Sequence, residues 1–220
     1  MPRDATTTRE RLIRAAERLF ARKGVDGTLT RELVEEAGQA NDSVVNYHFG
    51  SRGGLLLAVL DRHVRRMEEQ RKPALDRLGL DAGLPDVLDA VVAPLADQLR
   101  TEDGRDFLRI AAQLAGHAGV RTDELPAPVA GTALAGQLAL LTACCRDLLP
   151  EPEALERVAL MITMLTAALA DRARRIEEGE RATLGHEAFV ATLTAMLTAA
   201  LSPSAASQSR MSHNATNTAG

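Results

Sequence analysis

Apolar residues recur three or four positions apart along most of the 220-residue chain, which is the spacing of one face of an α-helix. No stretch alternates apolar and polar residues as a half-buried strand would. The pattern therefore predicts an all-α protein of about nine helices.

The first predicted helix opens on the spacing of a capping box. Thr7 and Glu10 stand three positions apart, so the side chain of each can accept a hydrogen bond from the backbone of the other. Gly24 can end the helix because glycine readily adopts the left-handed conformation of a helix C-terminus. We expect this helix to start at Thr7 and to end at Gly24.

Two shorter helices follow the first, each about two turns long. One follows Thr28 and ends at Ala37-Gly38, and the next covers residues 42–48 with Asn41 as its cap. Two short helices that are joined by a tight, glycine-containing turn and preceded by a longer helix are typical of a helix-turn-helix. Short helix pairs also occur as structural hairpins, so the spacing alone only favours DNA binding.

The remaining helices predict a larger second domain. A helix from about Arg52 to the Pro73 region is long enough to connect two domains. Five more helices are expected over residues 84–100, 103–117, 127–148, 153–178 and 186–201. We therefore divide the chain into a helix-turn-helix domain (1–52), a helical domain (53–202) and a tail rich in Ser, Ala, Asn and Thr (203–220), which we expect to be disordered.

Charge is distributed unevenly between the two parts of the chain. Residues 1–72 carry 14 Lys and Arg against 11 Asp and Glu, whereas residues 73–220 carry 12 against 19. A basic module on an acidic body suits a protein that binds nucleic acid through one end only. The excess is small, so it supports this interpretation without establishing it.

Cysteine content and leader signals indicate a reducing compartment. The two cysteines, Cys144 and Cys145, are adjacent and form no disulfide framework, so we expect buried thiols rather than a redox sensor. The chain does not open with the basic segment and the following apolar segment of a signal peptide, which predicts a cytoplasmic protein. The uncharged stretch 125–145 is long enough for a membrane span, but its proline, glycine and glutamine residues argue against one.

The third helix offers short polar side chains where a core helix would show Leu or Ile. Asparagine can pair with adenine and aspartate can accept a hydrogen bond from cytosine, so Asp42, Ser43 and Asn46 are candidates for base contacts. Hydroxyl, imidazole and guanidinium groups suit phosphate contacts, which fix register without reading sequence. The candidates for phosphate contacts are Thr30, Arg31, Tyr47, His48 and Arg52.

The segment 8–64 resembles the N-terminal domain of TetR-family regulators. The motifs that carry the resemblance are Ala15-Ala16-x-x-Leu19-Phe20-Ala21-x-x-Gly24, Ala37-Gly38 and Asn46-Tyr47-His48-Phe49-Gly50-Ser51-Arg52. The resemblance implies a homodimeric repressor that binds a near-palindromic DNA operator. Bound to DNA, it would associate with the nucleoid. The resemblance assigns backbone contacts to Thr30, Arg31, Tyr47, His48 and Arg52, and base contacts to residues 41–46, including Asn41. One residue more than in many family members lies between Gly38 and Phe49, which leaves the base-reading register open.

The resemblance also implies that the second domain dimerises and binds a small-molecule effector. Helices near 153–178 and 186–201 have apolar faces suited to a four-helix dimer interface or to the monomer core, and these faces comprise Leu155, Val158, Ile162, Leu165, Leu169, Phe189, Leu193, Met196 and Ala200. The candidates for the effector pocket are Phe107, Gln113, His117 and Met164. We expect no cofactor and no metal.

Two other functions remain open from the residues alone. A helical interaction protein that has lost DNA recognition would explain the weak basic excess and the acidic Asp42. An all-α enzyme is disfavoured because the five histidines lack metal-ligand spacing and the chain has neither a glycine-rich phosphate loop nor a nucleophile elbow.

Overall fold

The computed structural model describes residues 2–79, 82–118 and 127–203, and all regular structure in these ranges is helical. The predicted all-α fold is therefore confirmed. The tail from 204 onwards, for which we predict disorder, lies outside the described residues. The helices are α1 (Pro2–Lys23), α2 (Thr30–Glu36), α3 (Ser43–Phe49), α4 (Arg52–Arg77), α5 (Leu84–Asp97), a short 3-10 turn η1 (Gln98–Arg100), α6 (Glu102–Ala118), α7 (Ala133–Leu148), α8 (Glu151–Glu177) and α9 (His186–Leu201).

Two predicted helix starts are wrong. Helix α1 begins at Pro2, so Thr7 and Glu10 lie inside it and form no N-terminal capping box. Helix α7 begins at Ala133 rather than at 127, because Gly131 takes a left-handed conformation (φ +74°) and Thr132 caps the helix by accepting a hydrogen bond from the Ala135 N–H.

The helices form two hydrophobic cores. One core joins α1, α2 and α3 with the first part of α4, which contributes Leu55 and Val59. The other core lies between α5, α7, α8 and α9 and includes Met67 of α4. Ile110 of α6 is fully buried in the N-terminal core, while Phe107 and Leu108 of the same helix belong to the second core. Helix α6 is therefore shared by both cores.

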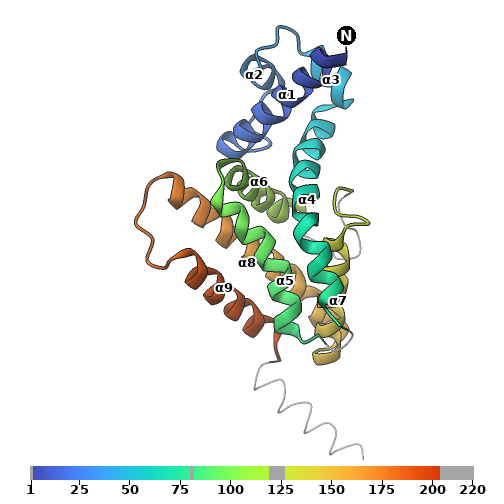
Figure 1. Ribbon diagram of the computed structural model, residues 1–220, viewed down its shortest axis with the longest axis vertical. Coiled ribbons are helices and arrows are strands. Elements are labelled where there is room, and N and C mark those ends of the chain that lie inside the picture. Colours follow the sequence, from blue (N-terminus) through green and yellow to red (C-terminus); the bar gives the residue numbers. More distant parts are fainter. Residues whose placement is uncertain (1, 80–81, 119–126, 204–220) are drawn as a thin grey trace, which may run out of the picture.

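Figure 1 shows how the two parts are joined. Helices α1 to α3 form one end of the molecule, and α4 runs from that end along the second domain. The domain boundary after residue 52 stays a prediction: α4 begins at Arg52, and the N-terminal core continues into that helix as far as Val59. One continuous helix therefore contributes side chains to both cores.

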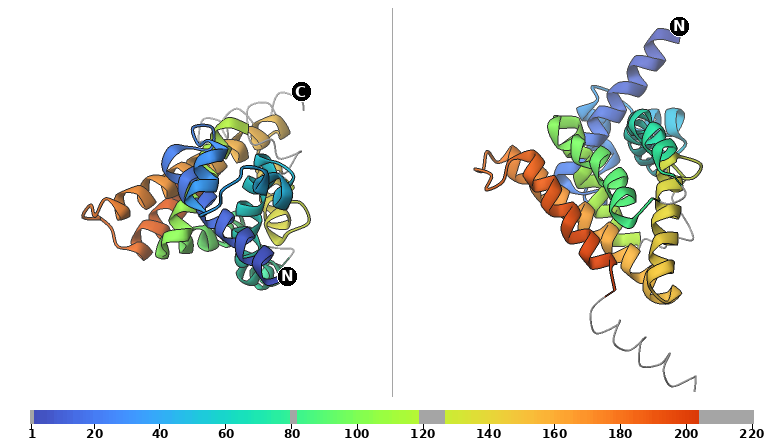
Figure 2. Two further views of the ribbon diagram at one scale, coloured as in Figure 1. Left: turned by 90° about the horizontal axis from the view of Figure 1, so that it is seen from above. Right: turned by 60° about the horizontal axis from the view of Figure 1, so that its bottom comes forward.

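Helices α8 and α9 pack against each other and form one side of the second domain (Figure 2). Helix α8 also packs along α6, and α9 along α5. Helix α7 closes the opposite side against α4 and α5. No helix within the described ranges has the length and apolar character needed to cross a membrane. Burial in the core raises the pKa of the Cys145 thiol to about 11, as expected for a buried cysteine of low reactivity.

Candidate nucleic-acid interface

The turn before α2 is held by hydrogen bonds to its backbone. The Thr28 hydroxyl donates to the carbonyls of Leu19 and Gly24, and the Glu32 carboxylate accepts from the Leu29 N–H. The pKa of Glu32 is lowered mainly by this hydrogen bond from Leu29 and, to a smaller extent, by the hydrogen bond from Lys23. The Glu32 carboxylate is therefore ionised at neutral pH. These bonds fix where α2 begins, and hence where the side chains of Thr30 and Arg31 emerge.

The connection from α2 to α3 depends on Gly38 and Asn41. Gly38 has a φ of +67°, which other residues rarely adopt, and it lets the chain reverse directly after buried Ala37. Asn41 Oδ1 then accepts a hydrogen bond of 2.9 Å from the Ser43 N–H at the start of α3. The predicted cap is therefore wrong by one residue: α3 begins at Ser43, its N-cap residue is Asp42, and the Asn41 side chain supports the helix start from the position before the cap.

Helix α3 buries Val45 in the core, packs the half-buried Val44 and Phe49 against it, and exposes its polar residues Ser43, Asn46 and Tyr47. Val45 is 1% exposed, whereas Tyr47 is 81% exposed. Asn41, Asp42, Ser43 and Asn46 are also exposed, so all four candidates for base contacts are accessible. A seven-residue helix that packs Val44, Val45 and Phe49 inward leaves its polar face accessible, which suits insertion into a major groove.

The predicted phosphate-contacting residues differ in their exposure. Arg31 is exposed, while Thr30 and His48 are half-buried. The rings of Tyr47 and His48 meet edge to face with centroids 4.9 Å apart. This packing limits the orientations of the Tyr47 side chain and leaves its hydroxyl at the surface.

Arg52 is engaged within the domain. Its Nη2 donates to the carbonyl of Val25 and, over 3.1 Å, to the carbonyl of Thr28, and its guanidinium lies 5.3 Å from the centre of the Phe20 ring. The side chain therefore clamps the turn between α1 and α2. The sequence reasoning missed this role, since nothing in the local pattern near Arg52 reveals carbonyls 24 and 27 residues away.

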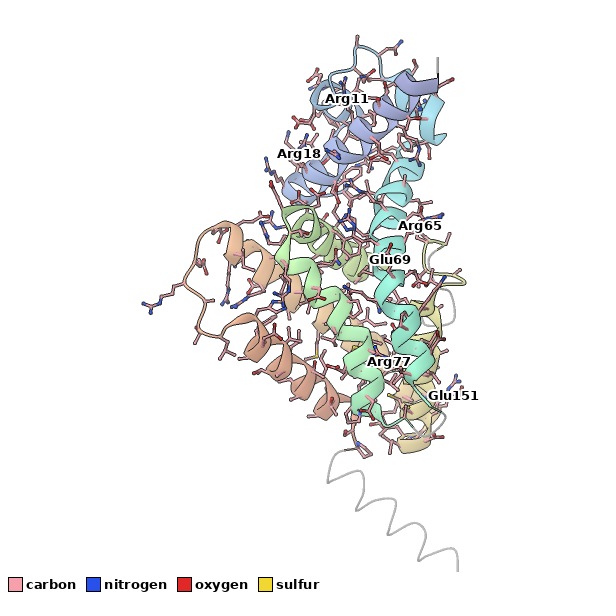
Figure 3. The ribbon with its side chains drawn as sticks, viewed as in Figure 1. Arg11, Arg18, Arg65, Glu69, Arg77 and Glu151 are labelled. Carbon is pink, nitrogen blue, oxygen red and sulfur yellow. The ribbon has the colours of Figure 1, made fainter. Side chains whose placement is uncertain are left out.

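A basic residue that the sequence analysis did not single out lies beside α3. The guanidinium of Arg9 stands 5.2 Å from the centre of the Phe49 ring, at the C-terminal end of α3. Arg9 is exposed, and two further exposed or half-exposed arginines, Arg11 and Arg18, follow along α1 (Figure 3). Only the fold brings Arg9 to this helix, because the two residues of the contact are 40 positions apart.

A buried polar cluster connects this domain to the second one. Glu17 of α1 is 2% exposed and hydrogen-bonds to the ring of His63 on α4, which is fully buried. The His63 ring stacks on Phe107 of α6, with centroids 4.6 Å apart and planes 14° apart. Arg62 adds an ion pair of 3.3 Å to Glu17. These contacts hold α1, α4 and α6 in one arrangement.

Gln113 of α6 makes a second connection. Its Oε1 accepts a hydrogen bond from the Val25 N–H over 2.8 Å, and its Nε2 donates to the Phe20 carbonyl over 3.2 Å. We predicted Gln113 as an effector contact, but its amide is bound to the backbone of the helix-turn-helix domain. Gln113 does line an open groove of about 540 Å³ between α1, α6 and α8, together with Arg22, Arg109 and Arg174.

The three predicted pocket residues whose side chains the structure describes have different surroundings. Phe107 is 5% exposed and packed against His63, whereas Met164 is 44% exposed on α8. His117 lies near the end of α6, and its side chain is outside the described residues. No group of His, Cys, Asp and Glu suited to a metal ion occurs among the side chains that the structure describes.

Comparison with known proteins identifies the N-terminal domain. Residues 12–59 match the family model for bacterial regulatory proteins of the tetR family. The chain resembles TetR-family transcriptional regulators. The match contains α2, α3 and the turn between them, so this pair lies in the segment that is similar to that family.

Solved structures of TetR-family proteins share the fold of the whole described chain. A TetR family transcription regulator from Marinobacter aquaeolei VT8 superposes with a TM-score of 0.56 and 15% identity, over 91% of this chain and 98% of that one. A TetR-family regulator from Streptomyces coelicolor A3 gives 0.50 and 24%, over 89% and 95%. A TetR-like transcriptional regulator from Rhodococcus sp. RHA1 gives 0.51 and 14%, over 86% and 93%. No curated protein matches the chain significantly.

Proposed function

We propose that this protein is a homodimeric transcriptional repressor that binds a near-palindromic DNA operator and is released by a small-molecule effector. The observation that carries the proposal is the surface of α3, which buries only Val45 and leaves Asn46 and Tyr47 exposed. This helix lies within the segment that matches the TetR-family model. As a regulator of transcription the protein would act in the cytoplasm, at the nucleoid.

We assign the DNA contacts by the chemistry and exposure of each side chain. Asp42, Ser43 and Asn46 read base edges, with Asn41 at the start of the same helix. Thr30, Arg31, Tyr47 and His48 contact phosphates, and Arg9 adds a positive charge at the end of α3. Arg52 supports these contacts by holding the turn before α2 in place.

The exposed surface of α8 and α9 supports a dimer. Leu160 and Met164, one turn apart on α8, are 53% and 44% exposed, and Met196 on α9 is 57% exposed. From Phe189 to the end of α9 no residue carries a charge. An uncharged, partly apolar surface on two adjacent helices suits a two-fold four-helix interface.

Several residues that we predicted for the dimer surface serve the monomer instead. Val158, Leu165 and Leu169 of α8 and Leu193 of α9 are buried in the second core. The apolar face that periodicity detects is therefore largely the inner face of these helices. The interface that we propose uses the opposite, outward positions, of which Met196 is one that the sequence also suggested.

A dimer and the connection through α6 together provide a mechanism of release. The two recognition helices must stand roughly 34–36 Å apart to enter successive major grooves. Gln113 and the Glu17–His63 pair tie each helix-turn-helix to the second domain. An effector that displaces α4 or α6 therefore changes the separation of the recognition helices and weakens binding.

The decisive experiment is selection of genomic DNA fragments by the purified protein, followed by affinity measurement. The Tyr47→Ala and Asn46→Ala variants remove exposed side chains, so we expect each to lose at least about tenfold in affinity with no change in melting temperature. Arg65→Ala, on the outward side of α4, is the control, since it removes an exposed arginine outside the helix-turn-helix. Failure to enrich any fragment, or equal affinity in all variants, would exclude the proposal.

A further inference from the structure

Arg71 is a buried cation that forms no ion pair with a carboxylate among the described side chains. Its side chain lies on α4 and is 1% exposed. Nη1 donates to Gln137 Oε1 over 2.6 Å and reaches the Val91 carbonyl at 3.5 Å, and Nη2 lies 3.9 Å from the Met67 sulfur. A guanidinium has five N–H donors, and these three contacts leave it poorly satisfied.

Two hydrogen-bond donors at this position have no acceptor. Arg71 Nε and Gln137 Nε2 are both buried and make no hydrogen bond. Gln137 is fully buried on α7, and the bond to Arg71 fixes the orientation of its amide, because a reversed amide would place its NH₂ group against the guanidinium. The two unpaired donors belong to groups joined by that 2.6 Å bond and so lie in one place.

The nearest acidic residue is used elsewhere. Glu68 stands one turn before Arg71, and its Oε2 accepts a hydrogen bond of 2.8 Å from the Ala133 N–H at the first turn of α7. A helix N-terminus stabilises a carboxylate, so the charge of Glu68 is engaged there. Its other oxygen, Oε1, has no partner, and no ion pair joins Glu68 to Arg71. The positive charge of Arg71 is thus left without a direct counterion.

Arg71 lies beside the apolar second core. Its contacts Met67 and Val91 belong to that core, as does Leu138, the residue after Gln137. Burial lowers the pKa of Arg71 to about 10, and the nearby Glu68 opposes that shift. The guanidinium is therefore still charged at neutral pH, beside an apolar core.

We propose that the second domain binds an apolar organic carboxylate between α4, α5 and α7, with its carboxylate oxygens accepting hydrogen bonds from Arg71 Nε and Gln137 Nε2. A carboxylate has two oxygens, so one can accept a hydrogen bond from the charged Arg71 Nε and the other from the neutral Gln137 Nε2, which matches the two unpaired donors in number. The neighbouring apolar core selects an apolar remainder of the ligand. The inference rests on the proposed function in that this ligand is the effector of the proposed regulator.

A purely structural role for Arg71 leads to a different expectation. An arginine that stabilises a core is paired with a carboxylate or with several carbonyls, and replacing it weakens the fold. An arginine kept for a ligand is an uncompensated charge until the ligand binds. Arg71→Met removes the charge but also leaves the buried Gln137 Oε1 without its donor, so its melting temperature alone does not separate the two roles. Loss of a ligand-dependent shift does separate them.

The test is thermal unfolding of the full-length protein with a panel of carboxylates and their uncharged counterparts. The panel contains butanoate, octanoate, dodecanoate and benzoate, each paired with the alcohol of the same carbon skeleton. We expect at least one carboxylate to raise the melting temperature by about 3 °C or more, while its alcohol has a smaller effect. Arg71→Met and Gln137→Leu should abolish the shift, and Arg65→Met, which removes an exposed arginine on the outward side of α4, should retain it.

Each outcome of this test decides the proposal. Equal shifts from carboxylate and alcohol, a shift that persists in Arg71→Met, or no shift across the panel would overturn it. If Arg71→Met does not fold, Gln137→Leu gives the answer, since it removes one proposed donor without touching the charge. DNA selection tests the proposed function separately. If the melting temperature shifts in an Arg71-dependent way but no DNA is selected, the proposal of a regulator is wrong and the carboxylate site stands. If DNA is selected but no carboxylate shifts the melting temperature, only the carboxylate site is wrong.

Discussion

Gln113 in the middle of α6 accepts a hydrogen bond of 2.8 Å from the backbone N–H of Val25, which follows α1. The two residues are 88 positions apart and belong to different functional parts of the chain. Residue 25 is in the segment that matches the TetR-family model, and residue 113 is in the second domain. This bond is therefore a direct mechanical connection between effector and DNA-binding domains in the proposed regulator.

Gln113→Leu should weaken this connection. The variant leaves the Val25 N–H without its acceptor and removes the bond to the Phe20 carbonyl, so we expect the free energy of unfolding to fall by about 1–3 kcal/mol. Urea unfolding measures the loss, and faster hydrogen exchange at the Val25 amide locates it. Gln70→Leu, an exposed glutamine on α4, is the control. Unchanged exchange at Val25 would mean that the bond does not hold the two domains together.

Arg52→Ala should destabilise the helix-turn-helix domain. The variant removes the hydrogen bonds to the carbonyls of Val25 and Thr28 and the contact with the Phe20 ring, with an expected loss of about 1–3 kcal/mol. Tyr47→Ala, at an exposed position, should leave stability unchanged while lowering DNA affinity. If Arg52→Ala lowers DNA affinity but has the melting temperature of the original protein, Arg52 contacts the phosphate backbone instead of stabilising the domain.

Asp106→Asn should change how stability depends on pH. Asp106 is 3% exposed, and its pKa is raised to about 6 chiefly by burial, then by the nearby Glu177, against an opposing effect of Arg109. A folded state with a raised carboxyl pKa binds its proton more tightly than the unfolded chain, so stability rises as the pH falls from about 7 towards 4.

The asparagine variant lacks this titration, so we expect it to be more stable than the original protein at pH 7.5. The difference should shrink as the pH falls through 6 and towards 4, where Asp106 becomes protonated. Urea unfolding at pH 4.5, 6 and 7.5 gives the comparison, with the exposed Asp103→Asn as the control. A constant difference across this range would show that Asp106 does not titrate there.

Leu160→Glu combined with Met196→Glu should convert the proposed dimer to a monomer. Both side chains are more than half exposed in the single chain, so charges at these positions cost the monomer little and repel across a two-fold interface. Sedimentation at several protein concentrations measures the mass. Leu148→Glu, at an exposed apolar position on α7, should remain dimeric. A double variant that keeps the mass of the original protein would place the interface elsewhere.

The periodicity of the chain was sufficient to predict its helices and the helix-turn-helix. The stop signals at Gly24 and Gly38 lie where the structure turns, since each needs a left-handed backbone that glycine adopts at low cost. The motif around Tyr47 was likewise enough to suggest the family, which the match over residues 12–59 bears out. These features are local, so they follow from residues that are near one another in the chain.

Only the tertiary structure decided how the side chains of Arg52, Arg71 and Gln113 are used. In sequence each is a polar residue on a helix, equally able to face solvent, DNA or a ligand. Apart from Met67, one turn before Arg71, their hydrogen-bond partners lie 20 to 93 positions away, so spacing along the chain carries no information about them. For the same reason the apolar pattern of α8 could not distinguish its buried face from the exposed Leu160 and Met164. Periodicity shows that a helix has an apolar face, but which neighbour covers that face depends on contacts that form only when distant helices pack.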